Sequence, residues 1–207
     1  MDISRRKALK TISKTAVVAS AGLLFGGQIS QALSKEQKLV LFYSSKYGAT
    51  SDISNWIAQG VSQPIQVINI TNTEHVNAVF SVKGSYILGS AVYKEQPMLA
   101  MQEFVALHRE KLDGNTIASF VVCGTQPDSD KNVKRIEGYL SKLNAPLTQK
   151  PSLTRQFGGR LVVEKLTPDD RAMLERFYTK VLSKPLVDWD RMNREEVMRM
   201  AQAVSFL

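Results

Sequence analysis

The stretch that decides the fold is Lys38-Leu39-Val40-Leu41-Phe42-Tyr43 followed by Ser45-Lys46-Tyr47-Gly48-Ala49-Thr50, an apolar strand that runs into a hydroxyl-rich loop. The next residues have the apolar spacing of an amphipathic helix, with Ile53, Trp56 and Ile57 on one face. The first backbone N–H groups of a helix lack partners within it, and the helix dipole adds positive charge there. The loop is therefore predicted to bind an anion, with a plain strand-to-helix turn as the alternative. It is neither GxGxxG nor a P-loop, which argues against a dinucleotide fold and an NTPase.

Residues 1–34 are predicted to be a twin-arginine export signal peptide, and residues 35–207 the folded domain. The run Ser4-Arg5-Arg6-Lys7 has the form of that signal, and the apolar stretch that follows is too short to span a bilayer comfortably. Ala32-Leu33-Ser34 offers small residues for cleavage before Lys35. We expect the twin-arginine translocase as a partner during export and a periplasmic location, with membrane association as an option. A basic N-terminal membrane anchor is the alternative.

Composition limits the other partners. Of 27 basic and 19 acidic side chains, 22 and 18 remain beyond residue 34, so the domain is mildly basic. This balance suits a small acidic substrate or an anionic membrane face, and no nucleic-acid partner is predicted. The single cysteine, Cys123, excludes an intrachain disulfide, and no metal site is predicted.

Apolar strands and helices alternate along the rest of the chain. A helix with Pro97 at its first position is predicted through about Lys111, and Thr167 and Asn193 are predicted helix caps. This alternation predicts an α/β fold, a doubly wound five-stranded parallel sheet with helices on both faces. The five strands are expected at residues 38–43, 65–70, 86–89, 117–122 and about 157–163.

Three patches resemble known flavoproteins. The loop from Ser45 to Thr50 resembles the FMN-phosphate loop of flavodoxins, Ser/Thr-x-Ser/Thr-Gly-x-Thr, with Tyr47 replacing one hydroxyl residue. Two further patches resemble the menaquinone-dependent protoporphyrinogen IX dehydrogenase family. They are Gly89-Ser90-Ala91-Val92-Tyr93, continuing to Gln102-Glu103-Phe104-Val105, and Val187-Asp188-Trp189-Asp190.

This resemblance implies a flavodoxin-like fold that binds FMN on the loops after the first, third and fourth strands, residues 44–50, 89–97 and 123–130. It implies oxidation of protoporphyrinogen with a quinone as acceptor. The phosphate would be held by Ser45, Lys46, Tyr47, Gly48, Ala49 and Thr50. One side of the flavin ring would be lined by Ser90, Ala91, Val92 and Tyr93, and its other edge by Cys123, Gly124 and Thr125.

The sequence departs from that family in two ways. The family works at the cytoplasmic membrane, whereas the signal directs this chain outward, and Gly124-Thr125-Gln126-Pro127 has no clear counterpart. The prediction is therefore an FMN-dependent oxidoreductase that transfers electrons between a small substrate and a quinone or other acceptor. The alternatives are a flavodoxin-type carrier without its own substrate and a binding module that has lost FMN. No acid–base pair emerges, and catalytic residues are not assigned.

Several residues have a plainer interpretation beside the functional one. Lys46 could be a solvated loop charge, and Tyr93 a surface aromatic rather than a ring-stacking one. Cys123 is better interpreted as a small apolar core residue than as a reactive thiol, and Trp189 is better interpreted as a packing residue than as a cofactor contact. A further prediction is a basic face that attracts carboxylates or anionic lipid, comprising Lys131, Lys134, Arg135, Lys142 and Lys150. The simpler interpretation of these residues is an ordinary solvated helix face.

Overall fold

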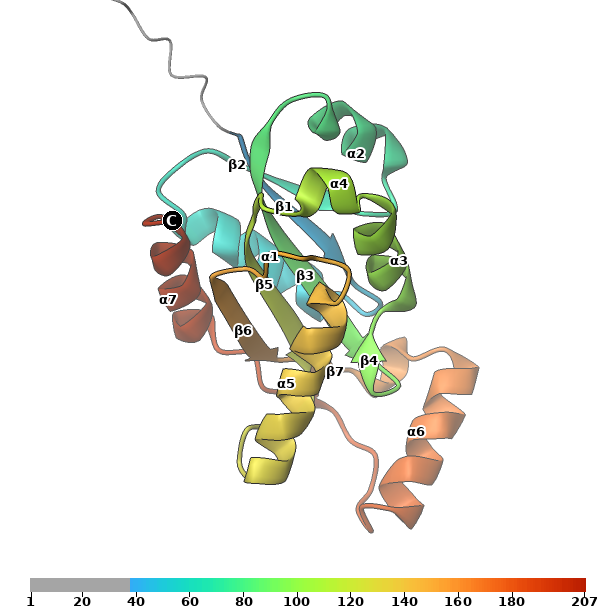
Figure 1. Ribbon diagram of the computed structural model, residues 1–207. Coiled ribbons are helices and arrows are strands. Elements are labelled where there is room, and N and C mark those ends of the chain that lie inside the picture. Colours follow the sequence, from blue (N-terminus) through green and yellow to red (C-terminus); the bar gives the residue numbers. More distant parts are fainter. Residues whose placement is uncertain (1–37) are drawn as a thin grey trace, which may run out of the picture. The chain divides into compact units, whose positions relative to one another are not determined.

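The computed structural model describes residues 38–207, and the predicted export signal lies outside the described residues. Five parallel strands form the main sheet in the spatial order β2 (Ile65–Asn69), β1 (Lys38–Ser44), β3 (Gly84–Tyr93), β5 (Thr116–Cys123) and β6 (Leu153–Gly158). The short β4 (Gln96–Pro97) pairs antiparallel with the end of β3. The order of the five parallel strands confirms the doubly wound sheet (Figure 1).

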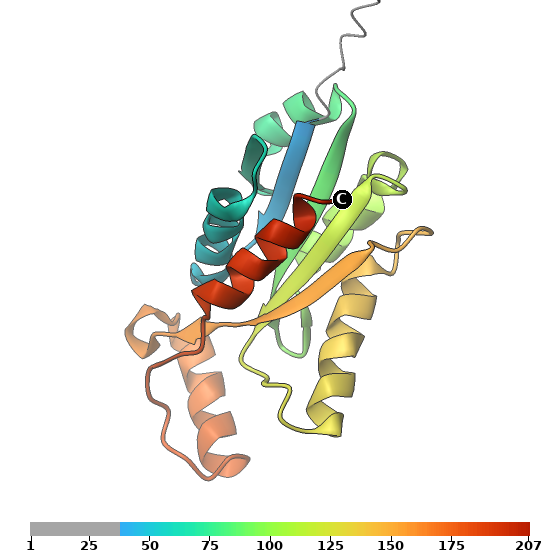
Figure 2. The same ribbon diagram turned by 90° about the vertical axis from the view of Figure 1, so that its left-hand side faces the viewer.

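Helices cover both faces of this sheet, as predicted (Figure 2). Successive side chains of a strand point to opposite faces. Leu39 and Leu41 of β1 accordingly join α1 (Ala49–Gly60) and α7 (Arg194–Val204) in one apolar core. Val40 and Phe42 join the core on the other face. The helices of that second core are α2 (Thr73–Phe80), α3 (Leu99–Leu107), α4 (Arg109–Leu112) and α5 (Asp130–Asn144).

Two sequence predictions placed elements wrongly. Pro97 does not begin a helix, because the chain first reverses at Lys94 and Glu95, whose φ angles are 49° and 65°, and Pro97 then pairs with β3. The fifth strand runs from Leu153 to Gly158, whereas the sequence placed it at about residues 157–163. A Cβ at Gly158 would collide with the backbone carbonyl of Arg191, so the returning chain crosses directly over the end of this strand.

The apolar residues expected to continue the fifth strand belong to a separate segment, residues 159–192, which connects β6 to α7. It contains β7 (Arg160–Leu161), a 3₁₀ turn η1 (Val163–Lys165), α6 (Pro168–Lys180) and β8 (Trp189–Asp190). The strands β7 and β8 pair antiparallel, so the segment leaves the end of the sheet and returns to it.

The two predicted helix caps, Thr167 and Asn193, are confirmed. The Thr167 hydroxyl accepts a hydrogen bond from the Asp170 N–H at 3.3 Å, and the Asn193 side chain accepts from Glu195 and Glu196. No helix within residues 38–207 combines the length and the apolar character needed to cross a bilayer.

Candidate cofactor site

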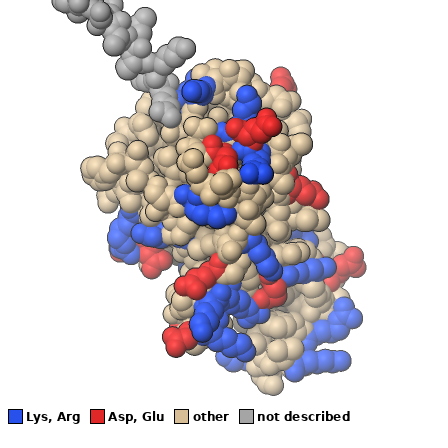
Figure 3. All heavy atoms as spheres, in the orientation of Figure 1, with Lys and Arg blue, Asp and Glu red and all other residues tan. Residues whose placement is uncertain are grey.

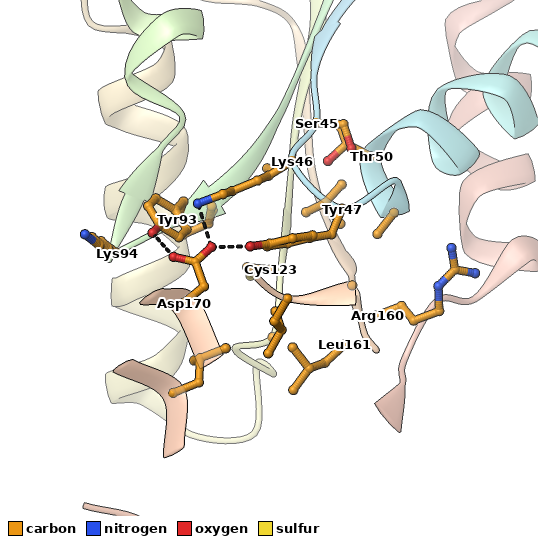
Figure 4. A pocket seen from close by; sticks show the side chains of 18 of the residues that line it. Ser45, Lys46, Tyr47, Thr50, Tyr93, Lys94, Cys123, Arg160, Leu161 and Asp170 are labelled. Carbon is orange, nitrogen blue, oxygen red and sulfur yellow. Dashed lines mark hydrogen bonds and ion pairs between the residues drawn. The ribbon is translucent and has the colours of Figure 1, made fainter. Parts of the chain in front are cut away.

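A cavity of about 220 Å³ lies at the carboxyl ends of β1, β3 and β5, where a doubly wound sheet binds its ligands (Figure 4). The three loops predicted from the sequence meet here, and segment 159–192 forms the remaining wall. The cavity wall includes ten of the thirteen predicted cofactor residues: Ser45, Lys46, Tyr47, Ala49, Thr50, Ala91, Val92, Tyr93, Cys123 and Gly124.

The loop after β1 has the geometry of an anion site. Gly48 has a φ of 95°, and its carbonyl accepts from the Asp52 N–H at 3.0 Å, so this left-handed residue starts α1. A left-handed backbone favours glycine. Thr50 in the first helical turn lines the cavity, and its buried Oγ1 has no hydrogen-bond partner among the described residues. A buried hydroxyl without a partner is costly, so a ligand oxygen at this helix start fits the loop.

Three predicted residues are not part of the cavity wall. Gly48 contributes to the turn of the loop, and its N–H donates a hydrogen bond to Ser45 Oγ at 3.1 Å. Ser90 is fully buried, and its hydroxyl oxygen accepts from the Met98 N–H at 3.0 Å, so it braces the β3–β4 turn. Thr125 lies in a neighbouring groove.

A buried carboxylate that the sequence did not predict lies at the mouth of the cavity. Asp170 of α6 accepts hydrogen bonds from the hydroxyls of Tyr47 and Tyr93, and its Oδ2 lies 2.6 Å from Lys46 Nζ. Burial by itself would raise the pKa of this carboxyl, but the bonds from Lys46, Tyr47 and Tyr93 outweigh burial and lower the pKa to about 2. Asp170 is thus a carboxylate at neutral pH.

The same contacts argue against the interpretation of Lys46 as a solvated loop charge. Its ammonium is engaged by Asp170 and lies 3.9 Å from the centroid of the Tyr93 ring, so it is not simply a solvated charge. Burial lowers the pKa of Lys46, and the hydrogen bonds to Asp170 and Tyr93 reverse that effect and leave the pKa raised. Tyr93 is correspondingly fixed at both its ring face and its hydroxyl.

Segment 159–192 contributes the site residues that sequence reasoning missed. Arg160 closes one side, where its guanidinium lies 2.7 Å from the carboxylate of Asp52 in α1. The sequence signals within this segment were the predicted helix cap Thr167 and the family-like patch around Trp189, and neither placed the segment at the cavity. The cavity-lining residues of this segment are Gly159, Arg160, Leu161, Leu166, Asp170, Met173, Leu174 and Trp189.

Trp189 and Cys123 have surroundings that fit the plainer interpretations. The Trp189 indole N–H donates to the Tyr178 hydroxyl at 2.8 Å, and its ring would lie 2.9 Å from a Cβ at Gly124, so the ring packs on that loop. Trp189 nevertheless also lines the cavity. Burial raises the pKa of the Cys123 thiol, which favours the protonated form of a small apolar residue. Within residues 38–207 no three His, Cys, Asp or Glu side chains gather in a way that could hold a metal ion.

The family model described as "Flavodoxin domain" matches residues 40–185. The chain belongs to the flavodoxin domain family. Proteins of this family generally bind FMN. No curated protein was found that matches the chain.

Solved flavodoxins and a related oxidoreductase are similar to this chain at low sequence identity and with TM-scores below 0.5. A flavodoxin from the domain Archaea is 16% identical with a TM-score of 0.46, covering 82% of this chain and 97% of its own. Oxidised flavodoxin 1 from Bacillus cereus is 14% identical with a TM-score of 0.45, and the match covers 80% of this chain and 95% of the flavodoxin. Rubredoxin oxygen:oxidoreductase from Desulfovibrio gigas is 15% identical with a TM-score of 0.43, covering 82% of this chain; the chain spans only 35% of that protein.

Proposed function

We propose that this protein binds FMN in the cavity and acts as an FMN-dependent oxidoreductase. The observation that carries the proposal is the Thr50 hydroxyl, buried at the start of α1 without a partner among the described residues and next to the left-handed Gly48. A phosphate there would accept hydrogen bonds from Thr50, from Ser45 and from the first N–H groups of the helix. The apolar walls from Val92, Leu161 and the α6 side chains suit a flavin ring.

Bound FMN would supply the one- and two-electron chemistry that the side chains do not. The chain's own contribution is to bind the phosphate, to enclose the ring and to fix Tyr93 beside it. Asp170 balances the charge of Lys46, so the pair adds little net charge to the cavity mouth.

A second reactant has room beside the cavity. A groove of about 690 Å³ shares Val92, Cys123, Gly124 and Trp189 with the cavity wall and continues between α5 and α6. A pure electron carrier needs only an exposed flavin edge, so the groove favours an enzyme with its own substrate. By resemblance we propose a porphyrinogen-like or other small acidic donor and a quinone acceptor. Rapid two-electron reduction of the flavoprotein by a candidate donor would support the enzyme, and reduction only by other redox proteins would support the carrier.

We propose further that the protein is exported by the twin-arginine translocase and works in the periplasm, in contact with the membrane surface. The N-terminal Ser4-Arg5-Arg6-Lys7 run supports export. An exported flavoprotein of this type would bind its flavin in the cytoplasm and keep it after translocation, which requires slow release.

The phosphate site is tested by Thr50→Val, which keeps the shape of the side chain and removes its hydroxyl. A hydrogen bond to a charged group contributes about 1.5–3 kcal/mol, so we expect FMN affinity to fall about tenfold or more. Full-length protein is incubated with excess FMN and desalted, and the flavin absorbance and dissociation constant are measured.

Thr73→Val is the matched control, since Thr73 lies exposed in the first turn of another helix, α2, away from the cavity. It should leave FMN affinity unchanged. A colourless wild-type protein with no measurable FMN affinity would remove both redox functions and leave the binding module. Equal affinity of wild type and Thr50→Val would contradict the assigned phosphate site.

A further inference from the structure

Helix α6 is held to the rest of the protein in an unusual way. Its only fully buried residue is Asp170, whereas Phe177 is exposed. Surface helices are ordinarily held by a stripe of buried apolar side chains. The position of α6 therefore depends heavily on one carboxylate.

The three donors to that carboxylate come from two different cofactor loops. Lys46 and Tyr47 belong to the loop after β1, and Tyr93 ends β3 (Figure 4). The Thr167 N–H also donates to the Tyr47 hydroxyl at 3.3 Å, next to the helix cap. A buried carboxylate is tolerated only where donors and an opposite charge surround it, so a displaced helix start would leave this carboxylate without its partners.

The carboxylate shares its face of α6 with two side chains of the cavity wall. Met173 and Leu174 follow Asp170 at i+3 and i+4, the spacing that brings helical side chains together. Both line the cavity and are partly exposed. Fixing Asp170 thus directs Met173 and Leu174 onto whatever occupies the cavity.

We propose that Asp170 is a positioning residue that fixes α6 over the cofactor cavity and so slows the release of the bound flavin. The inference rests on the proposed function, since it assigns the flavin to this cavity. A different role for the same carboxylate is electrostatic, namely repulsion of the FMN phosphate. Electrostatic repulsion would affect only a flavin that carries the phosphate, whereas positioning of α6 would affect flavins with and without it.

The test compares the release of FMN and of riboflavin, which lacks the phosphate, from full-length wild type, Asp170→Asn and Asp169→Asn. Asp169 is the matched control, because it is an exposed acid in the same first turn of α6. Positioning predicts that Asp170→Asn speeds the release of both flavins at least tenfold and by similar factors. Asp169→Asn should stay within twofold of wild type.

Two results would overturn the proposal: unchanged release of both flavins, or slower release of FMN with riboflavin unaffected. Should Asp170→Asn fold poorly, Tyr47→Phe removes a single donor to the carboxylate and leaves its charge pair intact. It also removes the acceptor of the Thr167 N–H. It should speed the release of both flavins by a common factor, and unchanged release would count against positioning.

A measurement without flavin separates this inference from the proposed function. In the flavin-free protein, Asp170→Asn should raise amide hydrogen exchange in residues 168–180 at least tenfold over Asp169→Asn and leave β1, β3 and β5 unchanged. Unchanged exchange in α6 would overturn the positioning role. Failure of wild type to bind any flavin, together with raised exchange in α6, would refute the proposed function while supporting the role of Asp170 in fixing the helix.

Discussion

Tyr47 shows how one residue can depart from a loop pattern without destroying the site. It replaces a small hydroxyl residue of the flavodoxin phosphate loop, and its hydroxyl reaches Asp170 of α6 instead of turning into the loop. The backbone of the proposed phosphate site is kept, because Gly48 and Thr50 retain their places at the start of α1. The exchange gives up one hydroxyl at the loop and gains an attachment point for α6.

The carboxyl of Asp170 should make the attachment of α6 depend on pH. Its pKa of about 2 in the folded protein lies below 3.8, the ordinary value for an aspartate side chain. The contribution of the Asp170 carboxylate to folding stability is thus fully present above about pH 4 and is lost as the pH falls toward 2. The shift in pKa corresponds to about 2 kcal/mol of stability. We expect the free energy of unfolding of wild type to exceed that of Asp170→Asn by this amount at neutral pH. This difference in stability should shrink as the pH falls from 4 to 2.

Urea titrations followed by Trp189 fluorescence would measure this difference in stability, since the Trp189 indole is hydrogen-bonded to Tyr178 of α6. Trp56→Phe in both proteins removes the other tryptophan. A difference that stayed constant or grew as the pH fell would contradict the assignment of the stabilising charge to Asp170.

At the scale of elements, α7 illustrates a helix whose sequence and packing agree. Asn193 caps it, and Val197, Met200, Ala201 and Val204 are buried in the core that α7 shares with α1. Losing such a cap costs about 1 kcal/mol. Asn193→Ala should therefore lower the free energy of unfolding by about that amount in a denaturant titration.

Asn193→Asp provides the control, because an aspartate can accept the same two backbone bonds, from Glu195 and Glu196. It should retain nearly the full stability. Equal losses for the alanine and aspartate variants would show that the side chain acts through other contacts.

The fifth strand is the element whose bounds the sequence placed wrongly. Leu161 and its apolar neighbours continue the strand-like pattern past Gly158, yet they pair with β8 in a second small sheet. Local pattern cannot show that Arg191, far along the chain, crosses the end of β6 and stops it.

At the scale of the whole molecule, basic side chains are spread unevenly. Figure 3 shows Lys and Arg gathered at the end of the described unit that carries α6, with acids among them. Two members of the predicted basic face are engaged within the protein. Arg135 is paired with Glu95, and Lys150 Nζ lies 2.9 Å from the Asn144 carbonyl oxygen and 2.6 Å from that of Leu147. An anionic partner would thus meet a smaller basic face than the sequence indicates.

The proposed export is also a property of the whole chain. Replacing Arg5 and Arg6 together by Lys keeps the charge and removes the twin-arginine pair. We expect the protein to remain in the cytoplasm and to keep residues 1–34, as judged by cell fractionation and mass spectrometry. Lys10→Arg is the control for a basic change in the same segment, and unimpaired export of the double variant would contradict the proposed route.

The sequence by itself determined the parallel sheet, its helices and the three loops that meet at the cavity. These follow from local periodicity, caps and the fixed relation between strand order and ligand edge. Only the tertiary structure decided that segment 159–192 forms the fourth wall and that Asp170 meets Lys46, Tyr47 and Tyr93. In the sequence Asp170 is an acid in the first turn of a helix, as Asp169 is. What separates the two is burial against residues more than seventy positions away, which no local pattern encodes.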